Sequence, residues 1–427
     1  MSSMRKPKRI KMFGSDGKEV MFLVKGGEDL RNDERIELLF GLMNTVVSSA
    51  SSTSTSTSTS NTTSFEEECN ISQFSRLQAR TYIVIPMTSQ VGILEWVSNT
   101  VPVKLVVSEE MSKDAQFCSK NESFNTDKDI TQTEAFQVRY DWVNGHEAPK
   151  YHKMIRDASQ KSANEVYAKM KSLLPDDFIR RRLLRVAESP ESFITLRTEY
   201  SKSLAVSSLF GYILGLGDRH LENLLLDTRT GGIVQIDFGY CFGMGQSIVP
   251  VPEFIPFRLT PQLIGVLQPL DGTVLLRHYM VRAMSHLRSD DGVQVLSNAL
   301  QVYVNDPLLD WIGNSDEKDD EPKRKVESCV RKLKGVDPGL IILEDLALNE
   351  TVKREKSLPA LKAIITRACL KGISGGQSTS TAALKCSVAF GGCESVLTVD
   401  QQIDALIALS TDPDVTVRQW VGLATWI

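Results

Sequence analysis

Two short motifs near the middle of the chain combine residue types suited to phosphoryl transfer. Asp218 is followed five residues later by Asn223, and Asp237-Phe238-Gly239 comes after an apolar run at 232–236. A carboxylate can orient an attacking hydroxyl, while amide and carboxylate oxygens are hard ligands of the kind that Mg²⁺ prefers. We therefore expect Asp218 to act as a base or hydroxyl-orienting group, and Asn223 and Asp237 to ligate Mg²⁺.

The order Asp218-Arg219-His220 differs from the His-Arg-Asp of ordinary protein kinases, although the offset from Asp218 to Asn223 is the same. Either motif alone is weak evidence, because such tripeptides also occur as unrelated surface turns. Here both flank a predicted hairpin at 224–236, which brings the two loops together. The pair therefore favours one shared site.

Lys25 is a candidate phosphate-binding cation. It ends a predicted strand and is followed by Gly26-Gly27-Glu28. Either Glu28 or Asp33 is expected to hold its ammonium group, and the sequence leaves that choice open. The alternative is a solvated lysine at a strand end. A Walker A loop is excluded, because the glycines and lysine at 14–18 lack its spacing and its following Ser or Thr.

The elements that would position Lys25 lie at the start of the chain. Arg9–Phe13 and Val20–Lys25 are predicted strands, joined by a turn at 14–17 that contains Asp16-Gly17. Apolar residues at helical spacing predict a helix over Glu28–Met43. A further strand is predicted over Arg80–Thr88, and Ser48–Ser64 is almost pure Ser and Thr and is expected to be a disordered insertion.

The second half of the chain reads mainly as helix, with an amphipathic segment over Val274–Leu287. The basic run Arg5–Lys11 fits either a DNA contact or nuclear signal, or a solvated strand edge, and we favour the strand edge. The arginines at 180, 181, 182 and 185 are predicted to form a solvated helix face. Trp420 and Trp426 are predicted to pack on the body of the protein, since exposed indoles are costly.

The composition indicates a globular protein without a global affinity for polyanions. The chain has 427 residues, 41% of them hydrophobic and 24% charged, and a net charge of −4. Its seven cysteines form no CxxC pair, which favours reduced thiols over a disulfide framework or a zinc site. We see no signal peptide and no apolar run long enough to cross a membrane.

Several phrases together resemble a known family. GLGDRHLENLLLD, IDFGYCF and PFRLT are similar to the catalytic core of the phosphatidylinositol-3-kinase-related protein kinases, in which Asp-Arg-His is the rule. KGGEDLRNDER and TYIVIPM match as well, and RQWVGLATWI resembles the family's C-terminal FATC segment. The resemblance implies an α+β, bilobal fold of the protein-kinase-like (PI3/PI4-kinase) type with a FATC helical tail. It also implies ATP and Mg²⁺ as cofactors.

The same resemblance assigns roles to individual residues. It places His220 near the transferring phosphate, beside Asp218, with Lys25 on the phosphates, Tyr82 in the inner pocket and Glu95–Val97 as the adenine-binding hinge. The residues implied to bind the nucleotide are Ser2, Ser3, Lys25, Glu28, Asp33, Tyr82, Leu94, Glu95, Trp96, Val97, Leu225 and Ile236. Met1–Met4 aligns inside the family's phosphate-binding loop, so the strand before that loop is expected to lie upstream.

The implied domains follow from these alignments. Residues 1–97 form the N-lobe and hinge, and residues 98–345 form the C-lobe, with a catalytic loop at 216–224 and an activation loop at 237–260. Residues 346–396 are expected to be a flexible regulatory segment, and residues 397–427 to be the FATC.

The resemblance implies a nuclear serine/threonine protein kinase that prefers Ser or Thr followed by Gln and acts in double-strand break repair by end joining. The Ku heterodimer and DNA ends would be bound only through upstream regions, and no membrane is implied. One alternative is a lipid kinase, whose activation loop should be basic, yet no Lys or Arg lies between Asp237 and Arg258 and Glu253 is acidic. Another is an inactive fragment that acts as a binding module.

Overall fold

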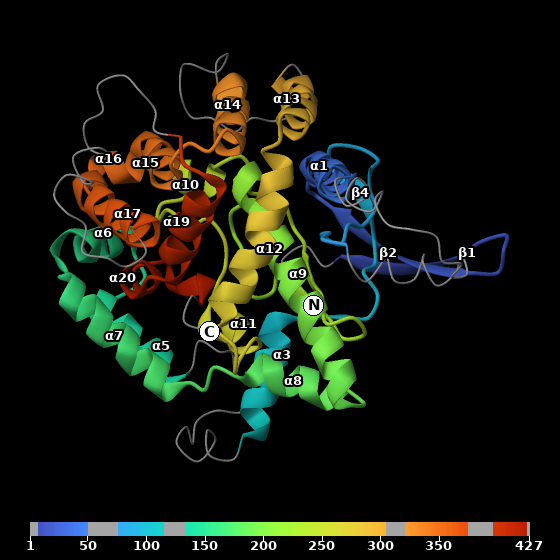
Figure 1. Cartoon of the computed structure of the whole chain (residues 1–427), viewed down its shortest axis with the longest axis horizontal. Coiled ribbons are helices and arrows are strands. Elements are labelled where there is room, and N and C mark those ends of the chain that lie inside the picture. Colours follow the sequence, from blue (N-terminus) through green and yellow to red (C-terminus); the bar gives the residue numbers. More distant parts are fainter. Residues whose placement is uncertain (1–6, 50–75, 115–132, 305–320, 375–395, 425–427) are drawn as a thin grey trace, which may run out of the picture.

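A small sheet-containing lobe sits beside a larger helical lobe in the computed structural model (Figure 1). The structure describes residues 7–49, 76–114, 133–304, 321–374 and 396–424. The fold is mixed α and β, as predicted.

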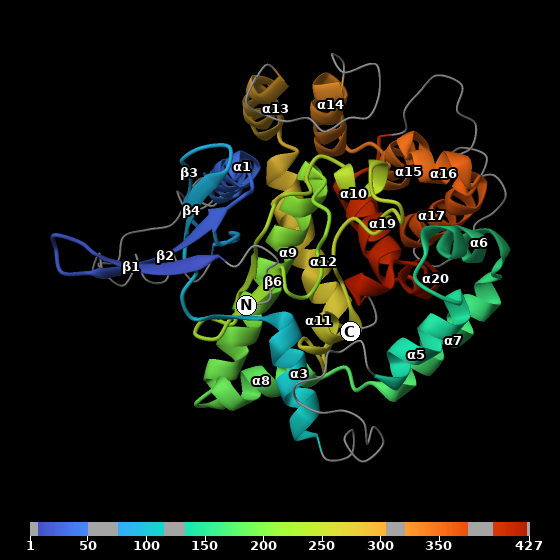
Figure 2. The same ribbon diagram turned by 180° about the vertical axis from the view of Figure 1, so that it is seen from behind.

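The N-lobe sheet has four antiparallel strands in the order β1-β2-β4-β3. They are β1 (Lys8–Phe13), β2 (Glu19–Gly26), β3 (Val84–Pro86) and β4 (Val91–Glu95). The predicted hairpin is confirmed, and Gly17 of its turn has φ +76°, a conformation that favours glycine. This hairpin projects from the body of the molecule in both views (Figures 1 and 2).

The predicted strand over Arg80–Thr88 is much shorter than expected. Within this segment, only Val84–Pro86 pairs with β4. Before Val84, side chains of α1 (Arg31–Ser49) form hydrogen bonds with the backbone instead. Asn44 exchanges two hydrogen bonds of 2.8 Å with the backbone of Ala79, and Glu37 accepts the N–H of Tyr82 at 3.2 Å. The segment therefore runs along α1 instead of forming a longer ladder.

The C-lobe is built around two long helices, α9 (Pro190–Leu214) and α12 (Gly272–Leu287), which contact each other. A small antiparallel sheet in the order β5-β6-β7 lies beside α9. Its strands are β5 (Thr100–Pro102), β6 (Leu224–Asp227) and β7 (Ile233–Gln235). The hairpin predicted at 224–236 is thus confirmed, and an ion pair between Arg80 and Asp227 joins this sheet to the N-lobe segment.

The remaining helices surround this centre (Figures 1 and 2). They are α3 (Val103–Lys113), α5 (Glu134–Val143), α6 (Ala148–Asp157), α7 (Gln160–Leu173), α8 (Phe178–Val186), α10 (Met244–Ser247), α11 (Pro261–Gly265), α13 (Asp290–Val304), α14 (Glu321–Leu333), α15 (Pro338–Leu348), α16 (Glu350–Arg354), α17 (Leu358–Ile373), α19 (Val399–Thr411), α20 (Pro413–Val417) and the 3₁₀ helix η2 (Val421–Leu423). No helix in the described parts of the chain is long and apolar enough to span a membrane.

The prediction of a flexible segment over 346–396 is wrong for its first part. Residues 350–354 and 358–373 form α16 and α17, and α17 packs on α15 and α19. Leu361, Ile365 and Ala368 are completely buried at helical spacing, an apolar stripe that fixes the helix in the core. Residues 375–395 of this prediction, like the Ser/Thr tract from residue 50 onward, lie outside the described residues.

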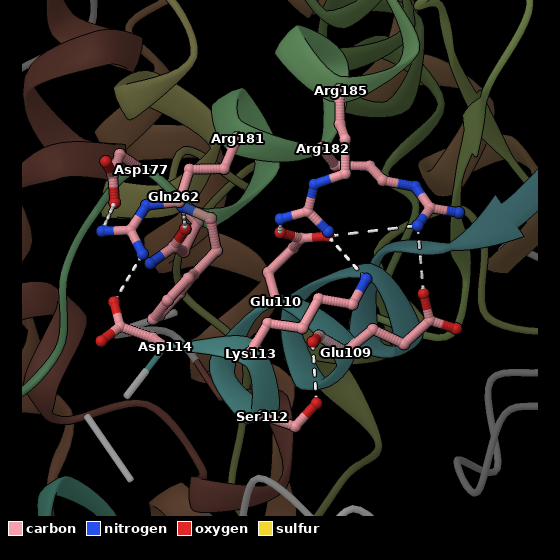
Figure 3. A network of polar contacts seen from close by, with 11 residues as sticks. Glu109, Glu110, Ser112, Lys113, Asp114, Asp177, Arg181, Arg182, Arg185 and Gln262 are labelled. Carbon is pink, nitrogen blue, oxygen red and sulfur yellow. Dashed lines mark hydrogen bonds and ion pairs between the residues drawn. The ribbon is translucent and has the colours of Figure 1, made fainter. Parts of the chain in front are cut away.

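The prediction of a solvated arginine face on α8 holds only in part, because the arginines keep some exposure but are paired with acids (Figure 3). Arg181 pairs with Asp114 and Asp177, and Arg182 with Glu109. Arg185 donates to Glu110, which is only 1% exposed. Arg180 contacts Asp177, the N-cap residue at the start of α8. The arginines thus join α8 to the acidic face of α3.

Candidate active site

The loop after α9 carries Asp218, His220 and Asn223. The helix ends at Gly215, whose φ of +61° turns the chain, and Asp218 also adopts a left-handed φ of +55°. The side chain of Asn223 donates to the carbonyl of Asp218 at 2.9 Å, which closes the loop on itself. Asn223 is 6% exposed, so its amide is fixed by its surroundings.

Backbone and arginine contacts bring the second motif against this loop. The N–H of Ile236 donates to the carbonyl of Asn223 at 3.1 Å, directly before Asp237. The buried guanidinium of Arg219 donates to the carbonyls of Gly217, Ile236 and Asp237. The negative charge of Asp237 raises the pKa of both Asp218 and Lys25, so Asp237 lies close to each of them. The hairpin therefore unites both motifs, as expected.

Lys25 enters the site from β2. Its ammonium lies 3.3 Å from Glu28 Oε1. Burial lowers the pKa of Lys25, but the charges of Asp237, Asp33 and Glu28 outweigh this effect, so its pKa lies above the ordinary value and the group is cationic. A lysine held among three acids in this way is suited to binding phosphate oxygens.

Asp33 has a different role from Glu28. Its Oδ1 accepts the backbone N–H of Phe238 at 3.1 Å, which ties α1 to the second motif. Burial raises the pKa of Asp33 to about 6. The choice that the sequence left open is thus resolved geometrically: Glu28 forms the ion pair with Lys25, and Asp33 holds the backbone next to Asp237.

The other residues predicted to contact the nucleotide lie in or next to the N-lobe sheet, in the segment that follows it, and in the hairpin before Asp237. The ring of Tyr82 stacks on Phe238 with centroids 6.3 Å apart. Leu94, Val97 and Leu225 are buried, and Ile236 is partly buried. The hinge is held by the N–H groups of Glu95 and Trp96, which donate to Ile83 and Met21, and Arg9 lies 5.2 Å over the Trp96 ring. Ser2 and Ser3 lie outside the described residues.

Asp218 and His220 shift each other's protonation. Burial raises the pKa of Asp218, while the nearby charges of His220 and Arg219 lower it, and the net direction is upward. Burial lowers the pKa of His220. His220 Nδ1 accepts the N–H of Glu222 at 3.2 Å, so the neutral ring carries its proton on Nε2, which lies 3.9 Å from Asp218 Oδ2.

Three charged residues of the site were not assigned to it from the sequence. Arg219 holds the two motifs together, Glu253 accepts the N–H of Asp218 at 2.7 Å, and Arg258 donates to the carbonyl of Leu423. Glu253 and Arg258 are charged residues within the apolar run VPVPEFIPFRL. A charge in such a run is a signal of a buried, partnered group, although it does not identify the partner.

The C-terminal segment contacts the activation-loop region through the backbone carbonyl of Leu423, which accepts from Arg258, and not through the side chain of Trp420. Val421 and Leu423 are buried, whereas Trp420 is 41% exposed. The indole of Trp420 lies beside Gly422, where a Cβ would come within 2.3 Å of the ring. The predicted packing of Trp420 on the body of the protein is therefore only partial, and Trp426 lies outside the described residues.

The donor set suits Mg²⁺ held jointly with phosphate. No group of three or more His, Cys, Asp or Glu side chains that could hold a metal occurs among the residues that the structure describes. Mg²⁺ in nucleotide sites needs only one or two protein oxygens, because phosphates and water complete its octahedron. Asn223 and Asp237 supply one amide and one carboxylate oxygen of that kind.

Comparison with known proteins agrees with this geometry. The sequence profile described as "Phosphatidylinositol 3- and 4-kinase" matches residues 19–312. The DNA-dependent protein kinase catalytic subunit of Dictyostelium discoideum is 33% identical over 446 residues, covering 99% of this chain and 9% of the relative. The tor1 serine/threonine-protein kinase of Schizosaccharomyces pombe is 33% identical over 313 residues, covering 73% of this chain and 11% of the relative.

Solved structures share the fold. The FAT and kinase domain of CtTel1 superimposes with a TM-score of 0.60 at 23% identity, covering 99% of this chain and 23% of that one. The first curated relatives are about ten times longer than the matched region, since this chain spans 9% to 10% of their length.

Proposed function

Since the chain belongs to the phosphatidylinositol 3- and 4-kinase family, we propose that it transfers the γ-phosphoryl group of ATP to serine or threonine of proteins. The observation that carries this proposal is that the loop of Asp218 and Asn223 meets the segment of Asp237, whose charge also acts on Lys25 of β2. The similar chains are named as protein kinases, which supports a protein acceptor.

The residues of the site have distinct tasks in this proposal. Asn223 and Asp237 would hold Mg²⁺, which neutralises the triphosphate and supplies electrostatic stabilisation when bound. Asp218 orients the acceptor hydroxyl and takes its proton. Lys25 and the Nε2–H of His220 offset the negative charge that develops on the phosphoryl oxygens. Tyr82, Leu94 and the hinge Glu95–Val97 line the nucleotide pocket.

The finer proposal is a nuclear enzyme that prefers Ser or Thr followed by Gln and acts in double-strand break repair by end joining. It is supported by relatives named DNA-dependent protein kinase catalytic subunit, which align over nearly the whole chain. Relatives named smg-1 and TOR align over about three quarters of it. Contacts with Ku and DNA ends are proposed to lie in regions outside this sequence.

The test is a direct comparison of acceptors. Residues 1–427 are incubated with Mg²⁺ and ATP and with either a Ser-Gln peptide or phosphoinositide vesicles. We expect phosphorylation of the peptide, because the segment 238–257 carries no basic residue that could bind an anionic headgroup. Turnover of the lipid alone would overturn the protein-kinase assignment.

The matched variants are Asp237→Ala and Glu165→Ala. Loss of a metal ligand should reduce the rate by at least ~10²-fold, whereas Glu165 has a side chain that is 67% exposed on α7 and should be neutral. Equal rates in both variants would show that Asp237 is not the ligand.

A further inference from the structure

The predicted activation loop contains a partly buried acid, Glu253, that reaches the backbone of the proposed catalytic loop. Glu253 Oε1 accepts the N–H of Asp218 at 2.7 Å, across 35 residues of sequence. The N–H of Glu253 in turn donates to the carbonyl of Gly245 at 2.9 Å, so the glutamate is fixed at its own backbone. A carboxylate accepting a backbone N–H forms a strong, charge-assisted hydrogen bond.

Two glycines allow this approach. A Cβ on Gly217 would lie 3.3 Å from Glu253 Oε1 and 3.1 Å from the Cα of Gly245. A Cβ on Gly245 would lie 3.1 Å from the same oxygen. All three distances are shorter than ordinary van der Waals contact. The absence of side chains at Gly217 and Gly245 therefore leaves room for the Glu253 carboxylate between the two backbone segments.

The bonded residue needs such support. Asp218 adopts φ +55°, a left-handed conformation that is unfavourable for a non-glycine residue and persists only where the surroundings hold it. The N–H of Asp218 is directed to Glu253, while its carbonyl accepts from the side chain of Asn223 at 2.9 Å. The peptide groups on both sides of the strained Cα are thus fixed, which sets the direction of the carboxylate.

The charge of Glu253 is balanced by two buried arginines. The positive charges of Arg219 and Arg258 both act on the Glu253 carboxylate. Arg258 also donates a hydrogen bond to the carbonyl of Leu423 in η2. Burial and the charge of Asp218 raise the pKa of Glu253, the N–H of Asp218 and the two arginines lower it, and the net direction is upward. The glutamate thus stands between the catalytic loop and the arginine that holds the C-terminal segment.

We propose that Glu253 is a positioning residue: it aims the Asp218 carboxylate at the acceptor hydroxyl by holding the Asp218 backbone in its left-handed turn. This inference rests on the proposed kinase function. Glu253 does not touch the nucleotide or the acceptor in this scheme. It acts through the N–H of Asp218, so its loss should slow the chemical step and leave nucleotide binding intact.

Two conservative variants separate geometry from charge. Glu253→Gln keeps an acceptor oxygen at the same reach and removes the charge. Glu253→Asp keeps the charge but withdraws the oxygen by one methylene. We expect the kcat of Glu253→Gln to stay within ~5-fold of the wild type and that of Glu253→Asp to fall ~30-fold or more, because displacement of a catalytic group by about 1 Å can cost ~10²-fold. The KM for ATP should change by less than ~3-fold in both variants.

The control is Glu110→Gln. Glu110 is a buried acid outside the proposed site, in the contact between α3 and α8. This variant should lower stability while the kcat per folded molecule stays unchanged. An Asp variant as active as the Gln variant, or a loss that appears in the KM for ATP, would overturn the positioning role.

Hydrogen exchange of the backbone at 216–223 keeps the inference testable when no acceptor is phosphorylated. The Asp218 amide should exchange faster in Glu253→Asp than in Glu253→Gln. A wild type that phosphorylates nothing would refute the proposed function alone, whereas equal exchange in the two variants would refute the role of Glu253.

Discussion

Asp218 Oδ2 and His220 Nε2 lie 3.9 Å apart, so the charge of each residue shifts the pKa of the other, and this should appear in the pH dependence of the reaction. Burial raises the pKa of Asp218, and the imidazolium of His220 lowers it. Asp218 accepts a proton only when ionised, so the rate should rise with pH through its pKa. In His220→Ala the positive charge is gone, the pKa of Asp218 increases, and the acid midpoint of kcat/KM should move to higher pH.

The same variant should lower kcat by about 10²-fold, the usual cost of removing one donor to a developing oxyanion. The measurement is the pH dependence of kcat/KM between about pH 5 and 8. The control is His278→Ala on α12, where the histidine is exposed and the midpoint should not move. A midpoint that moves to lower pH would mean that His220 does not act on Asp218 as a cation.

The sequence identified these residues because their chemistry is local. Asp218 and Asn223 lie in one loop, and the hairpin predicted at 224–236 brings Asp237 to them. The contacts of Arg219, Glu253 and Arg258 depend on the tertiary fold, since their partners are mostly backbone carbonyl and N–H groups far along the chain. A backbone partner leaves no residue type to recognise, so these three were missed.

The helix α1 connects the N-lobe to the site through its buried acids, and Glu37 is the one with the clearest effect on stability. Glu37 is 7% exposed, and its Oε2 accepts the N–H of Tyr82 at 3.2 Å. Burial raises its pKa from 4.5 to about 9. The folded protein therefore keeps a proton on Glu37 that the unfolded chain releases above about pH 4.5.

It follows that the free energy of unfolding should fall as the pH rises from about 4.5 to about 9. Glu37→Gln is a neutral isostere without this linkage, so it should stabilise the protein by about 1–3 kcal/mol near pH 7 and match the wild type near pH 4.5. Urea denaturation at several pH values measures the difference. Two parallel stability curves would show that Glu37 is ionised in the folded state.

The helices were located well where the spacing of their own apolar residues defines them. The predicted helix over Glu28–Met43 corresponds to α1 over Arg31–Ser49, and the segment over Val274–Leu287 lies within α12. The strand over Arg80–Thr88 was overestimated, because the side chains of Glu37 and Glu95 accept the N–H groups of Tyr82 and Ile83, which no local pattern shows. The arginines of α8 were misjudged for the same reason, since their acids lie mainly on α3.

At the scale of the whole molecule, the C-terminal segment is part of the core. The helix α19 contacts α12, α15 and α17, and α20 contacts α7 (Figure 1). Arg418 is 1% exposed and pairs with Asp414 at 2.8 Å. It also donates to the carbonyls of Met154 and Ala158, which anchors the segment on α6. Sequence alone indicated an ordered tail but not that its charges are buried.

Asp414 should therefore support the stability of the whole protein. Asp414→Asn leaves the guanidinium of Arg418 buried without its counter-charge, which typically costs about 3–5 kcal/mol. Glu165→Gln is the control, because its ion pair with Lys161 spans 4.0 Å between exposed side chains and should contribute at most about 0.5 kcal/mol. Urea denaturation followed by circular dichroism measures both variants. A cost for Asp414→Asn no greater than the control would mean that the segment is held by its apolar residues alone. Loss of the whole helical signal in one transition would show that the segment and the C-lobe unfold together, as expected from the contacts of α19 with α12 and α17.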